Sequence, residues 1–149
     1  MCVKNILIIE DNDPSKFTNL SVDGSSYSFN EKIHEMEKYC KDGFPQNLKT
    51  LVEIMSQCND GYILKDEKTN SVVPAGLPTE VALKTLVEKI SFYDSKFTRN
   101  TQGNLEQYGM TYNNNQKRVV TLEFTRERRG MSVLQNNKLL IKGSPDYII

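Results

Sequence analysis

The chain has 149 residues, of which 38% are hydrophobic and 26% charged, and its 19 basic residues balance its 19 acidic residues to a formal net charge of zero. This size fits one globular domain with a buried core, and the neutral balance argues against a nucleic-acid surface or a polybasic membrane contact. No apolar run reaches the roughly 18 to 20 residues of a membrane helix. We therefore expect a domain that contacts neither nucleic acid nor membrane, and in which an anionic ligand meets a local cluster of positive charge.

Residue types that often carry catalysis or bind metals are sparse and scattered. The cysteines Cys2, Cys40 and Cys58 are far apart and form no C-x-x-C pair, which predicts reduced thiols and neither a zinc site nor a disulfide framework. The single histidine, His34, lies in a charged stretch without a nearby nucleophile and is expected to be exposed. Phosphate-loop, G-x-G-x-x-G, H-E-x-x-H and G-x-S-x-G motifs are absent. We predict no catalytic residue and no metal site in this chain.

The first half of the chain predicts hairpins and two amphipathic helices. Strands are expected at residues 3–9, 17–22, 62–64 and 71–73. The charged stretch 30–42 predicts a loop or a short exposed helix. Apolar residues recur at helical spacing over residues 48–55, after Pro45, and again from Leu83 to Ile90. The second of these helices is expected to begin at Pro78, because a first helical position does not need the N–H that proline lacks.

The second half predicts a loop followed by three strands. Residues 94–116 are polar and rich in asparagine, which indicates a mobile loop with a helix around residues 105–110. Strands are expected at residues 119–126, 131–134 and 138–142. Asn136 and Asn137 suit a two-residue hairpin turn, because asparagine tolerates a positive φ, and residues 143–146 predict an N-cap and a first helical proline. The pattern predicts an α/β (α+β) fold, a mainly antiparallel sheet flanked by helices.

The stretch around Phe124 is a candidate ligand site. Phe124 and Arg126 are two apart in a predicted strand, so their side chains share a face about 7 Å apart. This spacing suits an aromatic platform under a purine with a guanidinium directed at its phosphates, because arginine forks match phosphate oxygens. The residues alone favour the alternative, in which Phe124 belongs to the core and the arginines are solvated.

Two further positions have a functional and a structural interpretation. Lys142 ends a predicted strand and precedes Gly143, which allows a ligand to approach the backbone closely, but the residues alone favour an exposed surface lysine. Glu80, with Thr79, lies in the first turn of the second helix, where the helix dipole alone favours a carboxylate. Glu80 also borders the buried stripe, from where it is able to accept a hydrogen bond from an exocyclic amine.

Several segments together resemble one family. Residues 142–146 (K-G-S-P-D) are similar to the K-G-A-P-E signature of the nucleotide-binding (N) domain of P-type ATPases. Residues 124–133 (F-T-R-E-R-R-G-M-S-V) look like the F-S-R-D-R-K-S-M-S-V stretch of the sarco/endoplasmic reticulum calcium pumps. Residues 76–89 resemble their G-E-P-T-E-x-A-L-x-x-L-V-E-K stretch, and residues 58–60 and 24–27 match further landmarks in the correct order. The resemblance covers essentially the whole chain and implies a fold like that of the P-type ATPase N domain.

The resemblance implies an adenine pocket at matching positions. Phe124 would stack on the adenine ring, and Met131 would pack near the same ring. Lys142 and Gly143 would line the base of the pocket. Glu80 would contact the edge of the adenine.

The remaining implied site residues include two departures from the family. Thr79 would contact the adenine edge beside Glu80, and Arg126 would reach towards the phosphates. Arg129 stands where the family usually has lysine, which keeps the charge but need not keep the geometry. Leu77 replaces a family glutamate, so a polar contact from that position is not expected.

The function implied by the resemblance is ATP binding within a calcium-transporting P-type ATPase. ATP, with Mg²⁺ in the full pump, would deliver its γ-phosphate to an aspartate of a separate phosphorylation domain and so drive calcium into the endoplasmic reticulum. The partners would be ATP and the phosphorylation and actuator domains, on the cytoplasmic face of the membrane. The D-K-T-G-T phosphorylation loop is absent, so the fragment alone is expected to be soluble and not catalytic.

Two alternatives stay open. The family domain continues past the K-G-A-P-E signature, so residues 1–149 are expected to be one N domain that is incomplete at its C-terminus. Such a fragment would keep the fold and act as a structural or interaction segment without binding nucleotide. The parent is alternatively a pump for another cation, because the membrane helices choose the ion.

Overall fold

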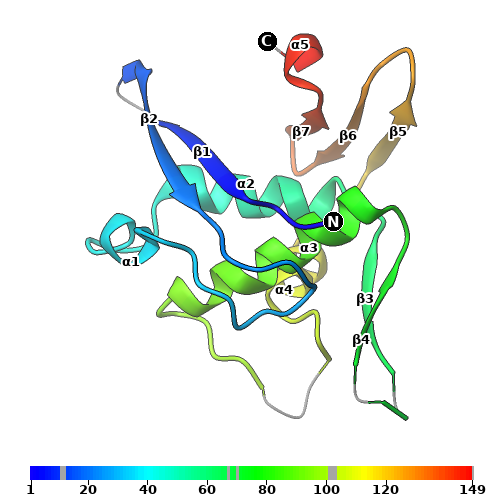
Figure 1. Ribbon diagram of the computed structural model, residues 1–149. Helices are drawn as coiled ribbons and strands as arrows, with labels where there is room; N and C mark the ends of the chain where they lie inside the picture. Colours follow the sequence, from blue (N-terminus) through cyan, green and yellow to red (C-terminus); the bar gives the residue numbers. More distant parts are fainter. Residues whose placement is uncertain (11–12, 67, 70, 101–103, 149) are drawn as a thin grey trace.

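Hairpins alternate with helices along the chain, in a computed structural model that describes residues 1–10, 13–66, 68–69, 71–100 and 104–148 (Figure 1). The strands are β1 (Asn5–Glu10), β2 (Asp13–Ser21), β3 (Tyr62–Lys65), β4 (Val72–Ala75), β5 (Val120–Thr125), β6 (Gly130–Gln135) and β7 (Lys138–Gly143). The helices are α1 (Met36–Tyr39), α2 (Gln46–Gln57), α3 (Pro78–Ile90), α4 (Tyr108–Asn115) and α5 (Pro145–Ile148), with a 3₁₀ turn η1 (Ser91–Tyr93) after α3.

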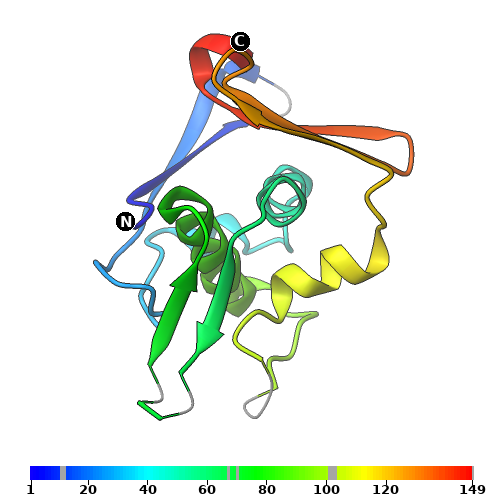
Figure 2. The same cartoon turned by 90° about the vertical axis from the view of Figure 1, so that its right-hand side faces the viewer.

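Every pairing between the named strands is antiparallel, as the sequence predicts. The described strands form three separate sheets, β1–β2, β3–β4 and β5–β6–β7. Figure 2 shows β1–β2 and the three-stranded sheet on one side of α2 and α3, with β3–β4 and α4 on the other. The class is therefore confirmed as mixed α/β with antiparallel sheets.

Two hydrophobic clusters hold these elements together. The larger one joins β1, β2, α2, α3 and α4, and its buried residues are Ile6, Ile8, Leu20, Val22, Ile33, Met36, Leu48, Val52, Met55, Leu86, Val87, Ile90 and Tyr108. The smaller one fixes the three-stranded sheet to the end of α2, through Cys58, Met131, Val133 and Leu140. The ends of β5 and β7 are thereby held beside the beginning of α3.

Helix α4 departs from the prediction. The sequence places a helix at residues 105–110 in a mobile loop, whereas the structure has α4 at Tyr108–Asn115; residues 101–103 of that loop lie outside the described residues. The reason is tertiary: the Tyr108 ring is 2% exposed and packs on the Phe97 ring at 4.8 Å between centroids. Burial of this aromatic anchor fixes a segment whose own composition is polar.

The C-terminal part of the chain follows the predicted turn and capping residues in part. Asn136 and Asn137 both have a positive φ, 43° and 60°, in the two-residue turn between β6 and β7, as predicted. Pro145 is the first residue of α5, also as predicted. The capping bond expected from Ser144 is absent, because among the described residues its buried hydroxyl has no hydrogen-bond partner.

Candidate functional site

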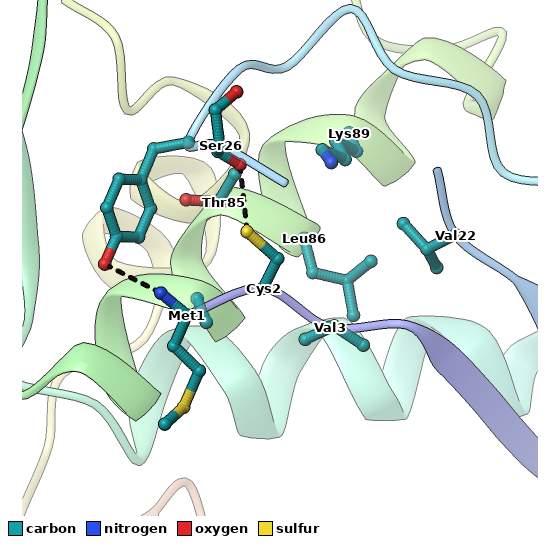
Figure 3. A pocket seen from close by; sticks show the side chains of 10 residues that line it. Met1, Cys2, Val3, Val22, Ser26, Thr85, Leu86 and Lys89 are labelled. Atoms are coloured by element: carbon teal, nitrogen blue, oxygen red, sulfur yellow. Dashed lines mark hydrogen bonds between the residues drawn. The ribbon is translucent and has the colours of Figure 1, made fainter. Parts of the chain in front are cut away.

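One hollow lies between the N-terminal residues and α3 (Figure 3). The Cys2 thiol there donates to the carbonyl of Ser26 at 3.2 Å, and the N-terminal amine donates to the Tyr27 hydroxyl at 3.4 Å. The free space is about 10 Å³, which holds at most one water molecule. This hollow is too small for an organic ligand.

A larger cavity of about 330 Å³ lies between the beginning of α3 and the ends of β5 and β7. Its lining residues are Leu77, Thr79, Glu80, Leu83, Phe124, Lys142 and Gly143. Helix α3 and the strand ends thus bring together five of the eight residues that the sequence proposes for the nucleotide site. Its volume is at the lower end of the range for small-molecule sites, roughly 300 to 1,000 Å³.

An ion pair forms the polar wall of this cavity. The Lys142 ammonium donates to the Glu80 carboxylate at 3.0 Å, and the two side chains are 21% and 13% exposed. Glu80 is held in place because the Asn59 side-chain amide donates to its backbone carbonyl at 2.9 Å. The cavity therefore offers a cationic donor and an anionic acceptor side by side, a combination that matches a ligand edge carrying both an acceptor and a donor.

The apolar wall comes from Phe124. Its side chain is 56% exposed, so the interpretation of Phe124 as a core residue is wrong. Lys142, in contrast, is partly buried in its ion pair and is not a free surface lysine. An exposed ring beside the ion pair gives a planar ligand both a stacking face and hydrogen-bonding groups.

Three proposed residues do not line the cavity: Met131, Arg126 and Arg129. Met131 is paired with Lys142 in the strand register but is 1% exposed and packs in the smaller core cluster. Arg126 is the first residue of the turn between β5 and β6, so the strand ends at Thr125, one residue before the predicted end.

Arg129 is engaged outside the cavity. It precedes β6 with a φ of 46°, and its guanidinium donates to the Asp146 carboxylate of α5 at 2.6 Å. Both side chains are 61% exposed. The pair joins the β5–β6 turn to α5 on an exposed surface.

Leu77 and Leu83 line the cavity although the sequence did not propose them as site residues. Leu83 lies three residues after Glu80 on α3, and this helical spacing was the available signal. Leu77 immediately precedes α3 and is 59% exposed. Leu77 therefore adds apolar surface to the lining at a position where the family motif has a glutamate.

Comparison with known proteins identifies the fold family. A sequence model of the P-type ATPase cytoplasmic domain N matches residues 47–149, which include every residue that lines the cavity. The chain belongs to this family. The resemblance of its sequence motifs to the P-type ATPase N domain is thereby confirmed.

Relatives of this N domain carry calcium-transport names. The endoplasmic reticulum-type calcium-transporting ATPase 4 of Arabidopsis thaliana is 30% identical over 134 residues, 87% of this chain and 12% of the relative. The endoplasmic reticulum-type calcium-transporting ATPase 2 of the same plant is 36% identical over 118 residues, 69% of this chain and 11% of the relative. The endoplasmic reticulum calcium ATPase srcA of Aspergillus fumigatus is 28% identical over 141 residues, 87% of this chain and 14% of the relative. The chain thus spans between 11% and 14% of the length of these relatives.

The described residues offer neither a membrane helix nor a metal cluster. No helix in the described ranges is long and apolar enough to cross a bilayer. Within the same ranges no group of histidine, cysteine, aspartate and glutamate residues is arranged to hold a metal ion. His34 is exposed as predicted, with its ring nitrogen 2.9 Å from a carboxylate oxygen of Asp23.

Proposed function

We propose that this N domain is the ATP-binding part of a calcium-transporting P-type ATPase and that the cavity between α3 and the ends of β5 and β7 takes the adenine. The observation that carries the proposal is the exposed Phe124 ring beside the Lys142–Glu80 ion pair, inside the segment that the family model matches. The relatives' names support calcium as the transported ion.

The cavity chemistry suits adenine. The exocyclic amine of adenine is a donor that Glu80 accepts, and the neighbouring ring nitrogen is an acceptor for Lys142. Stacking on Phe124 contributes about 0.5 to 1.5 kcal/mol beyond simple burial. Thr79 and Gly143 complete the rim, where the absence of a side chain on Gly143 allows close approach.

The arginines of the β5–β6 turn are assigned to the phosphates in this proposal. Arg126 is exposed directly after the strand that carries Phe124, and its fork matches phosphate oxygens. Arg129 takes the same role once it exchanges Asp146 for a phosphate. Met131 supports the adenine site from below, as a buried neighbour of Lys142 in the strand register.

Within the full pump, ATP with Mg²⁺ supplies the phosphoryl group. The proposal assigns to this chain the holding of the nucleotide, and assigns phosphoryl acceptance to an aspartate in a separate phosphorylation domain. The phosphorylation and actuator domains are its proposed partners, at the cytoplasmic face of the endoplasmic reticulum. We expect no ATP hydrolysis by the chain alone.

A titration tests the adenine site. We expect ATP to shift the backbone amide resonances of Phe124, Glu80 and Lys142 with an affinity on the order of millimolar, or about −4 kcal/mol. Phe124→Ala should weaken binding at least severalfold. Phe17→Ala is the matched control, because Phe17 lies on β2 and is 63% exposed, and should bind ATP as the unaltered chain does.

The main alternative is an N domain that keeps the fold without binding nucleotide. It is favoured by the ion pairs that already occupy Lys142 and Arg129. If no backbone amide resonance shifts at ATP concentrations up to several millimolar, this alternative holds. ATP binding that survives Phe124→Ala would instead place the nucleotide elsewhere on the chain.

A further inference from the structure

A second cavity, of about 420 Å³, lies between β3, the middle of α3, the segment that leads into α4, and α4 itself. Figure 2 shows α4 and the segment before it running beside the β3–β4 hairpin. This cavity shares no lining residue with the candidate adenine cavity. It is also larger, and its volume lies within the range of small-molecule sites, roughly 300 to 1,000 Å³.

A buried lysine lines this second cavity with incomplete hydrogen bonding. Lys84 is 3% exposed, and its ammonium lies 3.4 Å from a carboxylate oxygen of Glu106. The other oxygen of Glu106 accepts the backbone N–H of Ile63. An ammonium carries three N–H donors, and among the described residues Glu106 alone pairs with this one. Burial of a charged donor without full pairing is costly. A further hydrogen-bond acceptor beside the Lys84 ammonium would therefore be favourable.

A second lining residue, Asn113, also has a polar atom without a partner in the described part of the chain. The side-chain oxygen of Asn113 is buried and has no hydrogen-bond donor among the described residues. Lys65, which is exposed, adds another positive charge to the lining. With two lysines against the single carboxylate of Glu106, the lining carries a net charge of +1. Leu105 and Met110 supply apolar surface.

We propose that this cavity binds a small organic anion that also carries a hydrogen-bond donor. The anionic group pairs with Lys84, which satisfies the ammonium and neutralises the excess charge of the lining. The donor pairs with the Asn113 oxygen, and the carbon body lies against Leu105 and Met110. Hydroxy- and amino-substituted carboxylates have this combination of groups. The proposal does not depend on ATP binding, because the two cavities are lined by different residues.

The probe for this site is 4-hydroxybenzoate, and 4-hydroxybenzyl alcohol is its uncharged match. We expect saturable shifts of the Ile63 and Asn113 backbone amides when the ¹⁵N-labelled 149-residue chain is titrated with 4-hydroxybenzoate. The alcohol should bind at least tenfold more weakly. Absence of saturable shifts up to about 10 mM probe, or equal binding of the alcohol, would overturn the proposal.

A double variant separates recognition by Lys84 from non-specific contact. Lys84→Met combined with Glu106→Gln replaces the ion pair by neutral side chains of similar size, so that no buried charge is left without a partner. We expect it to weaken 4-hydroxybenzoate binding at least tenfold, and an unchanged affinity would refute the assignment. Phe124→Ala should leave the affinity unchanged, because a loss with that variant would place the probe in the adenine cavity.

Two single variants keep the test decisive if the double variant does not fold. Lys65→Gln alters an exposed residue, and Asn113→Ala places a strong helix former in α4. Each should weaken binding of 4-hydroxybenzoate about threefold or more. If neither changes the affinity, the cavity does not recognise the anion as proposed.

Discussion

Phe124 and Met131 belong to neighbouring strands of one sheet, and both are proposed for the same adenine site, yet their surroundings are opposite. The Phe124 side chain is 56% exposed, whereas Met131 is 1% exposed in the smaller core cluster. A ligand is able to contact Phe124 directly, whereas Met131 lies buried behind the residues that line the cavity. Substitution of Phe124 should therefore affect ligand binding, and substitution of Met131 should affect the stability of the fold.

Alanine substitutions test this separation. Phe124→Ala should change the free energy of unfolding by no more than about 0.5 kcal/mol, as for a surface position. Met131→Ala should lower it by about 2 to 5 kcal/mol, because it leaves a cavity in the core. Urea denaturation of both variants measures the difference. A loss for Phe124→Ala as large as that for Met131→Ala would show that the ring is packed in the core after all.

Cys58 gives the fold a dependence on alkaline pH. Burial raises the pKa of the Cys58 thiol above its ordinary value of 9.0, and its S–H donates to the Leu140 carbonyl at 3.5 Å. Because the folded state keeps this proton longer than the unfolded state, the stabilisation is complete below pH 9 and declines as the pH rises through the raised pKa. The free energy of unfolding should fall by at most about 1.4 kcal/mol per pH unit from this group.

Denaturation at several pH values between neutral and alkaline checks the Cys58 effect. Cys58→Ala is the matched control, since it removes the titrating thiol and leaves the other ionisable groups of the chain in place. The decline above pH 9 should be shallower in this variant. Identical slopes for the two chains would mean that Cys58 does not contribute.

At the scale of single elements, α4 depends on a carboxylate from another helix. Glu88 of α3 is 1% exposed and accepts backbone N–H groups of Gln107, Tyr108 and Gly109 at 3.0 to 3.2 Å. The same carboxylate also pairs with Arg99. It satisfies the donors that a helix N-terminus leaves unpaired, and its negative charge suits the helix dipole.

Glu88→Gln should therefore unfold α4 before the rest of the chain. Removing the charge leaves Arg99 without its buried partner and weakens the cap, with an expected loss of about 3 to 5 kcal/mol. Amide shifts of α4 and urea denaturation measure the two effects. Glu37→Gln on the exposed face of α1 is the control. Equal stability of the two variants would contradict the capping role.

The sequence could predict elements whose pattern is local. Helices α2 and α3 and the Asn136–Asn137 turn follow from apolar spacing, proline positions and tolerance of positive φ. The start of α4 could not be predicted, because it is set by Glu88, which lies about twenty residues earlier in the chain. Secondary structure of this kind depends on contacts that periodicity does not encode.

The candidate site was only partly predictable for a similar reason. Residue chemistry alone favoured a core position for Phe124 and a surface position for Lys142, and the family resemblance reversed both. The pairing of Lys142 with Glu80 joins residues 62 positions apart. No local sequence pattern indicates such a contact, so the geometry of the cavity could be obtained only from the three-dimensional structure.

At the scale of the whole molecule, the two hydrophobic clusters differ in size. The larger one joins helices α2, α3 and α4 to the N-terminal hairpin, whereas the three-stranded sheet rests on the smaller cluster around Met131. The candidate adenine cavity lies across this division, with Glu80 on the helical side and Phe124 and Lys142 on the sheet. The sheet should open at a lower free energy than the helical core.

Amide hydrogen exchange tests this division. Amides of β6 and β7 should exchange faster than those around Val87 in α3, and Met131→Ala should speed exchange in the sheet while leaving Val87 unchanged. ATP bound across the division should slow exchange in β7, by about sixfold at a concentration five times its dissociation constant. Uniform exchange in the sheet and in α3 would show one cooperative unit. If ATP slows amide exchange in β7 equally in Phe124→Ala, the nucleotide stabilises the sheet from another position.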